Sequence, residues 1–180
     1  MDHRQDTQDR FTAADACTVA DITHATLLNW VSRQPPAILL TAAEREVAGK
    51  GYPLTFSFNR IMQIAITAEM VRVGWRPRPA AMAAVAFTDV GESSGHREGE
   101  EAPTVRRPGE LFATGTTLLI AYDPSAEAGR AAKCIKVDAD TNWSALFGPI
   151  RRGGVPLNVA TIVNVSHIWV RARMALGLHL

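Results

Sequence analysis

The sequence has few of the residues and patterns that define several protein classes. Its 180 residues include only two cysteines, Cys17 and Cys134, which can form neither a disulfide framework nor a four-thiolate zinc site. No apolar run approaches the roughly 20 residues that a membrane-spanning helix needs. The first ten residues are polar and charged, unlike the apolar core of a secretory signal peptide. These absences predict a cytoplasmic protein that does not enter a membrane.

An excess of charge of one sign is also lacking. Lys and Arg together number 19 and Asp and Glu 18, so the formal net charge is +1. This balance excludes a strongly basic coat or an acidic tail, although a basic face can still be balanced by acids elsewhere. Apolar residues make up 47% of the chain, which is enough to bury a sizeable core without covalent staples.

Patterned and turn-rich stretches divide the chain into four parts. Residues 1–10 form a polar, flexible leader, and residues 11–88 carry clear helix and strand patterns. Residues 89–109 are rich in glycine, proline and acids and have almost no large apolar side chain, which predicts a mobile linker or loop. Residues 110–180 are apolar again and rich in β-branched residues, and we expect them to form a second module.

Two short helices joined by a tight turn are predicted at the start of the first module. Thr12 and Asp15 have the T-x-x-D spacing of a helix start, so a helix is expected over 13–19. Asp21 falls where a tight turn needs a left-handed residue, and a second, amphipathic helix is expected over 24–32. This order is typical of a helix-turn-helix unit.

A β-hairpin and two further helices are predicted next. The apolar residues 38–40 and the alternating residues 52–58 are expected to pair as a hairpin. Helices are then expected over 61–71 and 79–87. Helix, turn, helix, hairpin, helix, helix is the order of a winged helix-turn-helix. The expected fold class is therefore α+β, with this winged module followed by a small α+β module that ends in a helix.

Residues 11–84 contain Thr-Leu-Leu-Asn-Trp at 26–30, Gly-Tyr-Pro-Leu-Thr-Phe-Ser at 51–57 and Val-Arg-Val-Gly-Trp at 71–75. With these motifs they resemble the DNA-binding domain of MerR-type regulators. The family's Thr-Leu-Arg-x-Tyr/Trp helix is similar to Thr-Leu-Leu-Asn-Trp at residues 26–30. Its wing, which ends in Gly-Tyr-Arg-x-Tyr-Ser, resembles Gly-Tyr-Pro-Leu-Thr-Phe-Ser at residues 51–57. Its Leu-x-x-Gly-Phe/Trp element corresponds to Val-Arg-Val-Gly-Trp at residues 71–75. The resemblance implies a protein that binds double-stranded DNA as a two-fold dimer.

The chain departs from the family pattern at its turn, its recognition helix and its wing. The turn glycine is Asp21, and the helix arginine that the family uses on phosphate is Leu28. Pro53 and Leu54 stand around the place of the wing arginine. The loss of two phosphate-binding arginines has two interpretations. Either the protein binds DNA more weakly, or the winged-helix fold serves a different function.

The residues expected to contact DNA lie on the second helix, in the wing and at the start of the third helix. Short polar side chains on a helix can reach base edges in the major groove, and nearby bases can hold phosphates. The alternative is that the threonines only cap the helix, the asparagine is solvated and the tryptophan packs in the core over Ile38 and Phe56. The candidate DNA-binding residues are Thr23, His24, Thr26, Asn29, Trp30, Arg33, Arg45, Lys50, Tyr52 and Arg60.

The second module is expected to contain strands over 116–122, 132–137 and 159–165 and a closing helix over 166–176. The apolar stripe of that helix has a period of 3.6 residues, so it is either a core face or a symmetric dimer seam. The candidate dimer-interface residues are Val165, Ile168, Trp169, Ala172 and Leu176.

The second module carries no recognisable catalytic constellation. Residues 110–180 lack a nucleophile–base pair, a phosphate-binding glycine loop and a cluster of metal ligands. Arg151 and Arg152 are expected in a solvated turn, with an anion contact as the alternative. We therefore expect neither an enzyme nor a bound cofactor or metal.

These patterns together predict a DNA-binding transcriptional regulator that acts as a homodimer. One alternative is a winged-helix protein-interaction module that has lost part of its phosphate contacts. A DNA-packaging or recombination accessory protein would use the same module. A third reading places a small-molecule sensor or enzyme in residues 110–180. The sequence names no small-molecule effector.

Overall fold

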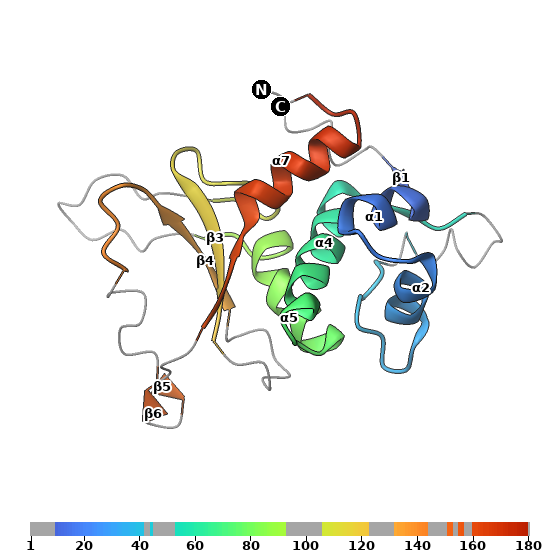
Figure 1. Ribbon diagram of the computed structural model, residues 1–180, viewed down its shortest axis with the longest axis horizontal. Helices are drawn as coiled ribbons and strands as arrows, with labels where there is room; N and C mark the ends of the chain where they lie inside the picture. The colour runs from blue at the N-terminus through green and yellow to red at the C-terminus, as the bar shows by residue number, and fades with distance from the viewer. Residues whose placement is uncertain are drawn as a thin grey trace.

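The protein is a mixed α+β structure in which helices pack beside small antiparallel sheets (Figure 1). The computed structural model describes residues 10–41, 44, 53–92, 106–122, 132–143, 151–152, 155–156 and 160–179. The helices of this part are α1 (Ala13–Ala20), α2 (His24–Ser32), α4 (Phe58–Arg72), α5 (Pro77–Thr88) and α7 (Val165–Ala175). Its strands are β1 (Phe11–Thr12), β2 (Thr55–Phe56), β3 (Thr116–Ala121), β4 (Ala132–Val137), β5 (Arg151–Arg152), β6 (Val155–Pro156) and β7 (Thr161–Asn164).

The first two helices begin and end where the sequence predicts. Thr12 and Asp15 form a reciprocal capping box, with the Asp15 amide donating to Thr12 Oγ1 at 3.2 Å. Asp21 ends α1 in the left-handed conformation, with φ at 52°. Thr23 then caps α2, because its hydroxyl oxygen accepts a hydrogen bond from the Thr26 amide at 3.1 Å.

Helix α4 is the central helix of the structure. It begins at Ser57, whose hydroxyl oxygen accepts a hydrogen bond from the Arg60 amide. Apolar side chains lie on almost every side of it, which is typical of a helix buried all round. In Figure 1 it lies between the α1–α2 pair and helix α5, with α7 crossing over it. Helix α4 therefore connects the helical end of the molecule to the end that carries the sheet.

The prediction of a hairpin between residues 38–40 and 52–58 is wrong for the residues that the structure describes. Strand β2 pairs instead with β1, with Phe11 opposite Phe56 and Thr12 opposite Thr55. Residues 38–40 form no strand, and the amide of the buried Ile38 donates to the Trp30 carbonyl. That bond folds the segment back over the end of α2, so it is not in position to pair. Of the expected tip, residues 44–51, the structure describes Glu44 alone.

The larger sheet has the strand order β4-β3-β7 and is antiparallel throughout. Leu119 of β3 lies opposite both Cys134 of β4 and Val163 of β7, and all three side chains belong to the hydrophobic core. Helix α5 packs against β3 and β4, and α7 packs against β3. The predicted strands over 116–122 and 132–137 and the closing helix are confirmed.

The two expected modules share one hydrophobic core, which contains side chains from α1, α4, α5, α7 and the larger sheet. The last part of the expected mobile linker, residues 106–109, packs into this structure, because Arg106 is only 1% exposed. Its guanidinium donates to the carbonyl oxygens of Ala86 and Phe87 at the end of α5, where the helix itself supplies too few donors. Residues 93–105 of the expected linker lie outside the described residues. None of the described helices has the length and apolar character that crossing a membrane requires.

Candidate nucleic-acid interface

Helix α2 turns one face to the protein and the other to solvent. Leu27 and Trp30 are buried, whereas His24, Leu28 and Asn29 are exposed. The helix contains no aspartate or glutamate, so its outer face offers hydrogen-bonding groups without negative charge. Figure 1 shows α2 beside α1 and α4, at the end of the molecule away from the larger sheet.

The hydroxyl groups at the start of α2 serve the helix itself. Thr23 Oγ1 accepts from the Thr26 amide, and the two threonine hydroxyl oxygens lie 2.9 Å apart. The interpretation of Thr23 as a capping residue is confirmed, whereas Thr26 supplies the amide that Thr23 caps; a DNA contact by either stays a prediction. His24 and Asn29 are therefore the polar side chains that the outer face offers most freely.

Trp30 is wrong as a candidate DNA contact, because its side chain is buried in the hydrophobic core. Ile38 and Phe56 belong to the same core, which confirms the alternative reading of this tryptophan. Its carbonyl oxygen accepts from the amides of Ala37 and Ile38 at 2.8 and 3.0 Å. Trp30 thus anchors the inner face of α2 and the segment that follows it.

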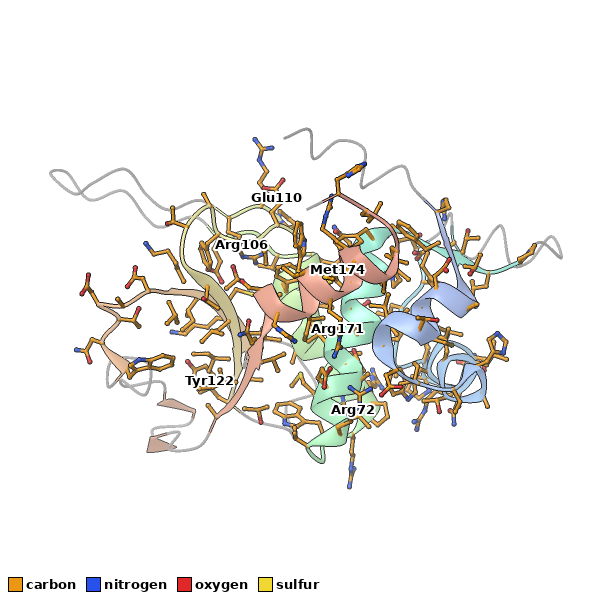
Figure 2. The ribbon with its side chains drawn as sticks, turned by 45° about the horizontal axis from the view of Figure 1, so that its top comes forward. Arg72, Arg106, Glu110, Tyr122, Arg171 and Met174 are labelled. Atoms are coloured by element: carbon orange, nitrogen blue, oxygen red, sulfur yellow. The ribbon has the colours of Figure 1, made fainter. Side chains whose placement is uncertain are left out.

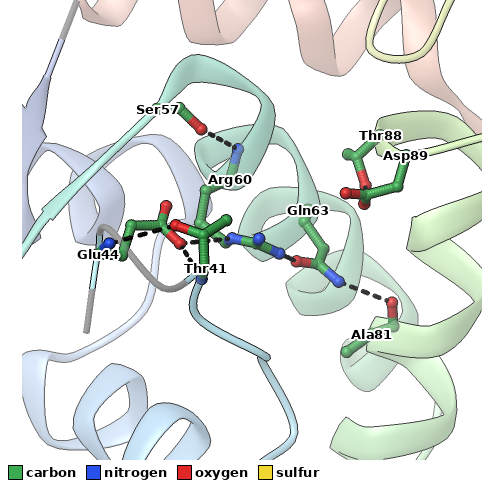
Figure 3. A network of polar contacts seen from close by, with 8 residues as sticks. All are labelled: Thr41, Glu44, Ser57, Arg60, Gln63, Ala81, Thr88 and Asp89. Carbon is green, nitrogen blue, oxygen red and sulfur yellow. Dashed lines mark hydrogen bonds and ion pairs between the residues drawn. The ribbon is translucent and has the colours of Figure 1, made fainter. Parts of the chain in front are cut away.

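Arg60 is also wrong as a DNA contact, because its side chain lies within a buried polar network (Figure 3). The Arg60 Nε atom lies 3.5 Å from Glu44 Oε2, an ion-pair contact longer than an ideal hydrogen bond. One terminal nitrogen donates to the Gln63 side-chain oxygen, and Gln63 donates in turn to the Ala81 carbonyl. This chain of contacts ties α4 to α5, so the guanidinium is not available to phosphate.

The same network holds Glu44 against α4. Its carboxylate accepts from the Thr41 amide at 2.7 Å, and its own amide donates to the Thr41 hydroxyl at 3.2 Å. These reciprocal bonds are those of a capping box. Glu44 is almost completely buried, so the Arg60 cation is what compensates its charge.

Arg72 joins the end of α4 to the turn between α1 and α2. Its Nη2 atom donates to the carbonyl oxygens of Ala20 and Asp21, at 2.6 and 3.0 Å. Its Nη1 atom lies 2.8 Å from the Glu69 carboxylate, and Arg171 Nη2 donates to the same carboxylate at 2.7 Å. Figure 2 shows Arg72 on α4 and Arg171 on α7. The turn before α2 is thereby tied to both helices.

The two arginines lower the pKa of the Glu69 carboxyl. Partial burial opposes this by raising the pKa, but the hydrogen bonds and positive charges of Arg171 and Arg72 outweigh it. The sequence analysis missed this group. The spacing of Glu69 and Arg72, three residues apart on a helix, is the one signal that could have revealed part of it.

The structure describes some of the remaining basic residues that could contact DNA, and others lie outside the described residues. Arg33 directly follows α2 and is exposed, as are Arg76 and Arg78 at the start of α5. Arg45, Lys50 and Tyr52 lie outside the described residues. Arg33 is thus the one predicted DNA-binding arginine that the described structure leaves exposed.

The dimer seam expected on the closing helix is wrong, because that stripe faces the core of its own chain. Val165, Ile168 and Ala172 are buried, and Trp169 and Leu176 pack against the same core. The Trp169 ring meets the Phe58 ring edge to face, with centroids 6.2 Å apart. The periodicity identified a buried face correctly, but its partners are α1, α4 and β3 of the same chain.

Comparison of this chain with protein-family models, with curated proteins and with solved structures finds no match. Among the residues that the structure describes, no group of three or more His, Cys, Asp or Glu side chains is placed to hold a metal ion. The case for a functional site therefore depends on the geometry and charge of α2 and its surroundings.

Proposed function

We propose that the protein binds double-stranded DNA through α2 and acts as a transcriptional regulator. The observation that carries this proposal is the outer face of α2, which exposes His24 and Asn29 beside Leu28 and is free of carboxylates. An α-helix fits the major groove of B-form DNA, where base edges offer hydrogen-bond donors and acceptors. The capping bonds of Thr23 and the buried side chains of Leu27 and Trp30 hold this helix rigidly on its support.

In this proposal the polar residues of α2 contact bases, and the arginine that follows the helix contacts phosphate. The Asn29 amide can both donate and accept, which suits adenine, and His24 lies at the helix start, where recognition helices approach the bases. Arg33 follows the helix and is placed to hold a phosphate, which adds affinity without sequence information. Because Arg60 and Arg72 bind groups of the protein, we expect few phosphate contacts and a shallow dependence of affinity on salt.

The test is a fluorescence anisotropy titration with labelled duplex DNA of random sequence at two salt concentrations. We expect binding that weakens as salt rises, and a smaller salt slope, by about 1, for Arg33→Gln. On a sequence enriched by selection, Asn29→Ala should lose about 1–3 kcal/mol of preference over random DNA. The absence of binding at low salt would overturn the proposal.

A second candidate function is the binding of another protein. Leu28 on α2 is 42% exposed and Leu39, in the segment after α2, is 55% exposed. Exposed leucines are not by themselves unusual, but Leu28 lies on the same outer face as Asn29. A protein that fails to bind DNA at low salt would favour this second function.

A further inference from the structure

The turn that precedes α2 is supported from outside its own segment. At the end of α1 the carbonyl oxygens of Ala20 and Asp21 both accept from the Arg72 guanidinium. A cation at the C-terminal end of a helix also interacts favourably with the helix dipole. The Asp21 carboxylate, 3.4 Å from the same guanidinium, is 90% exposed and contributes little through solvent screening. The backbone carbonyls are therefore the groups through which Arg72 holds the turn.

The position of Arg72 depends in turn on Glu69. The Glu69 carboxylate uses one oxygen to bind Arg72 and the other to bind Arg171 of α7, at 2.8 and 2.7 Å. Each oxygen is thus committed to one arginine. A shift of Arg171 would release one oxygen of Glu69 and allow the carboxylate to rotate away from Arg72.

We infer that Arg171, Glu69 and Arg72 are positioning residues that set the orientation of α2 from helix α7. The continuous chain of contacts from α7 through α4 to the α1–α2 turn is the observation that carries this inference. Its consequence for DNA recognition rests on the proposed function, whereas the mechanical connection between the helices does not. Helix α7 packs against α1, α4 and β3, so the connection joins the turn before α2 to a helix that contacts both the helical part and the sheet.

These three residues contribute more to the orientation of α2 than to the free energy of unfolding of the whole protein. The side chains of Arg72, Glu69 and Arg171 are 38%, 29% and 40% exposed, and pairs at such sites stabilise a fold only weakly. The core that holds α4 and α7 together is formed by other, fully buried side chains. Loss of the network should therefore loosen the turn locally and leave the core folded.

Hydrogen exchange of the full chain tests the mechanical connection. In Arg72→Met and Arg171→Met we expect amides at residues 20–26 to exchange faster, by roughly twofold to thirtyfold, with the larger effect in Arg72→Met. Arg171→Lys, which retains the charge, should restore part of the protection. Arg107→Gln is the matched control, because the exposed Arg107 side chain lies 4.0 Å from Glu110, a residue that Figure 2 shows well apart from Arg72. Unchanged exchange at residues 20–26 in both methionine variants, or a rise spread equally over all helices, would overturn the inference.

DNA titration separates this inference from the proposed function. On labelled random duplex, Arg171→Met should weaken binding and leave the salt slope of the wild-type protein unchanged, because the residue positions α2 without touching phosphate. A slope smaller by about 1 would make Arg171 a phosphate contact and overturn the positioning role. If the wild-type protein binds no DNA, the proposed function fails, and the exchange measurement still decides whether α7 orients α2.

Discussion

The guanidinium of Arg106 donates a 2.6 Å hydrogen bond to the carbonyl oxygen of Val90, just beyond the end of α5. Arg60, Arg72 and Arg173 likewise bind groups of the protein, and the Arg173 guanidinium also lies over the Trp169 ring. These four arginines, of the 19 lysines and arginines in the sequence, therefore hold helix ends and helix pairs together. The charge available to a nucleic acid is smaller than a count of arginines indicates.

Replacement of Arg106 by methionine should destabilise the fold by about 3–5 kcal/mol. The side chain is buried and serves five carbonyl oxygens, which would be left without these donors. Urea unfolding gives the free-energy difference. Arg107→Gln, at the exposed neighbouring position, should change it by no more than about 0.5 kcal/mol. A loss below about 1 kcal/mol in Arg106→Met would contradict the role assigned to this side chain.

Trp169→Ala should destabilise the chain by about 2–4 kcal/mol, because the ring packs against Phe58 and the core. The urea midpoint of the variant should not depend on protein concentration, since the contact lies within one chain. Met174→Ala, on the exposed face of the same helix, is the control and should have little effect. If Trp169→Ala kept the stability of the wild type but had a lower mass in sedimentation, the stripe on α7 would be a dimer interface after all.

The two cysteines should differ in reactivity toward an alkylating reagent in the native protein. Burial of Cys134 raises the pKa of its thiol to about 12, so almost no thiolate forms at neutral pH. Burial also raises the pKa of Cys17, but that side chain is only half-buried and should react first. Mass spectrometry of the alkylated peptides gives the two rates, and both thiols should react alike in urea. Equal rates in the folded protein would refute the packing of Cys134.

The stabilising effect of Glu69 should disappear in acid. Its pKa is lower in the folded protein than the ordinary value of 4.5, so its contribution is present above that value and is lost as the pH falls through the folded pKa. The difference in unfolding free energy between wild type and Glu69→Gln should therefore be largest near neutral pH and shrink below about pH 4.5. Urea titrations across this range measure it. A difference that stays constant into strong acid would show that the ion pairs do not stabilise the fold.

Local sequence signals predicted those elements whose ends are set by neighbouring residues. Thr12, Asp21 and Thr23 mark the ends of α1 and the start of α2 through hydrogen bonds and backbone conformations that span a few residues. The apolar strands β3 and β4 were found in the same way. Burial of Trp30 was one of two open readings, because an aromatic residue at that position fits either the core or a partner.

The remaining features depend on contacts between distant parts of the chain. Strand β2 pairs with β1 across more than forty residues, so alternation in residues 52–58 could not identify its partner. Arg106 lies in a polar stretch whose composition hides a buried side chain. The stripe on α7 predicted a buried face, but periodicity alone does not distinguish a core of the same chain from a second copy.

The outer face of α2 is tested most directly by Leu28→Arg, which places an arginine on the exposed face of this helix. We measure the salt dependence of binding to random duplex DNA for this variant and for the wild type. If α2 lies in the major groove, the variant should bind more tightly and its salt slope should be steeper by about 0.9, the value for one added phosphate contact. An identical slope and affinity in both proteins would contradict DNA binding through α2.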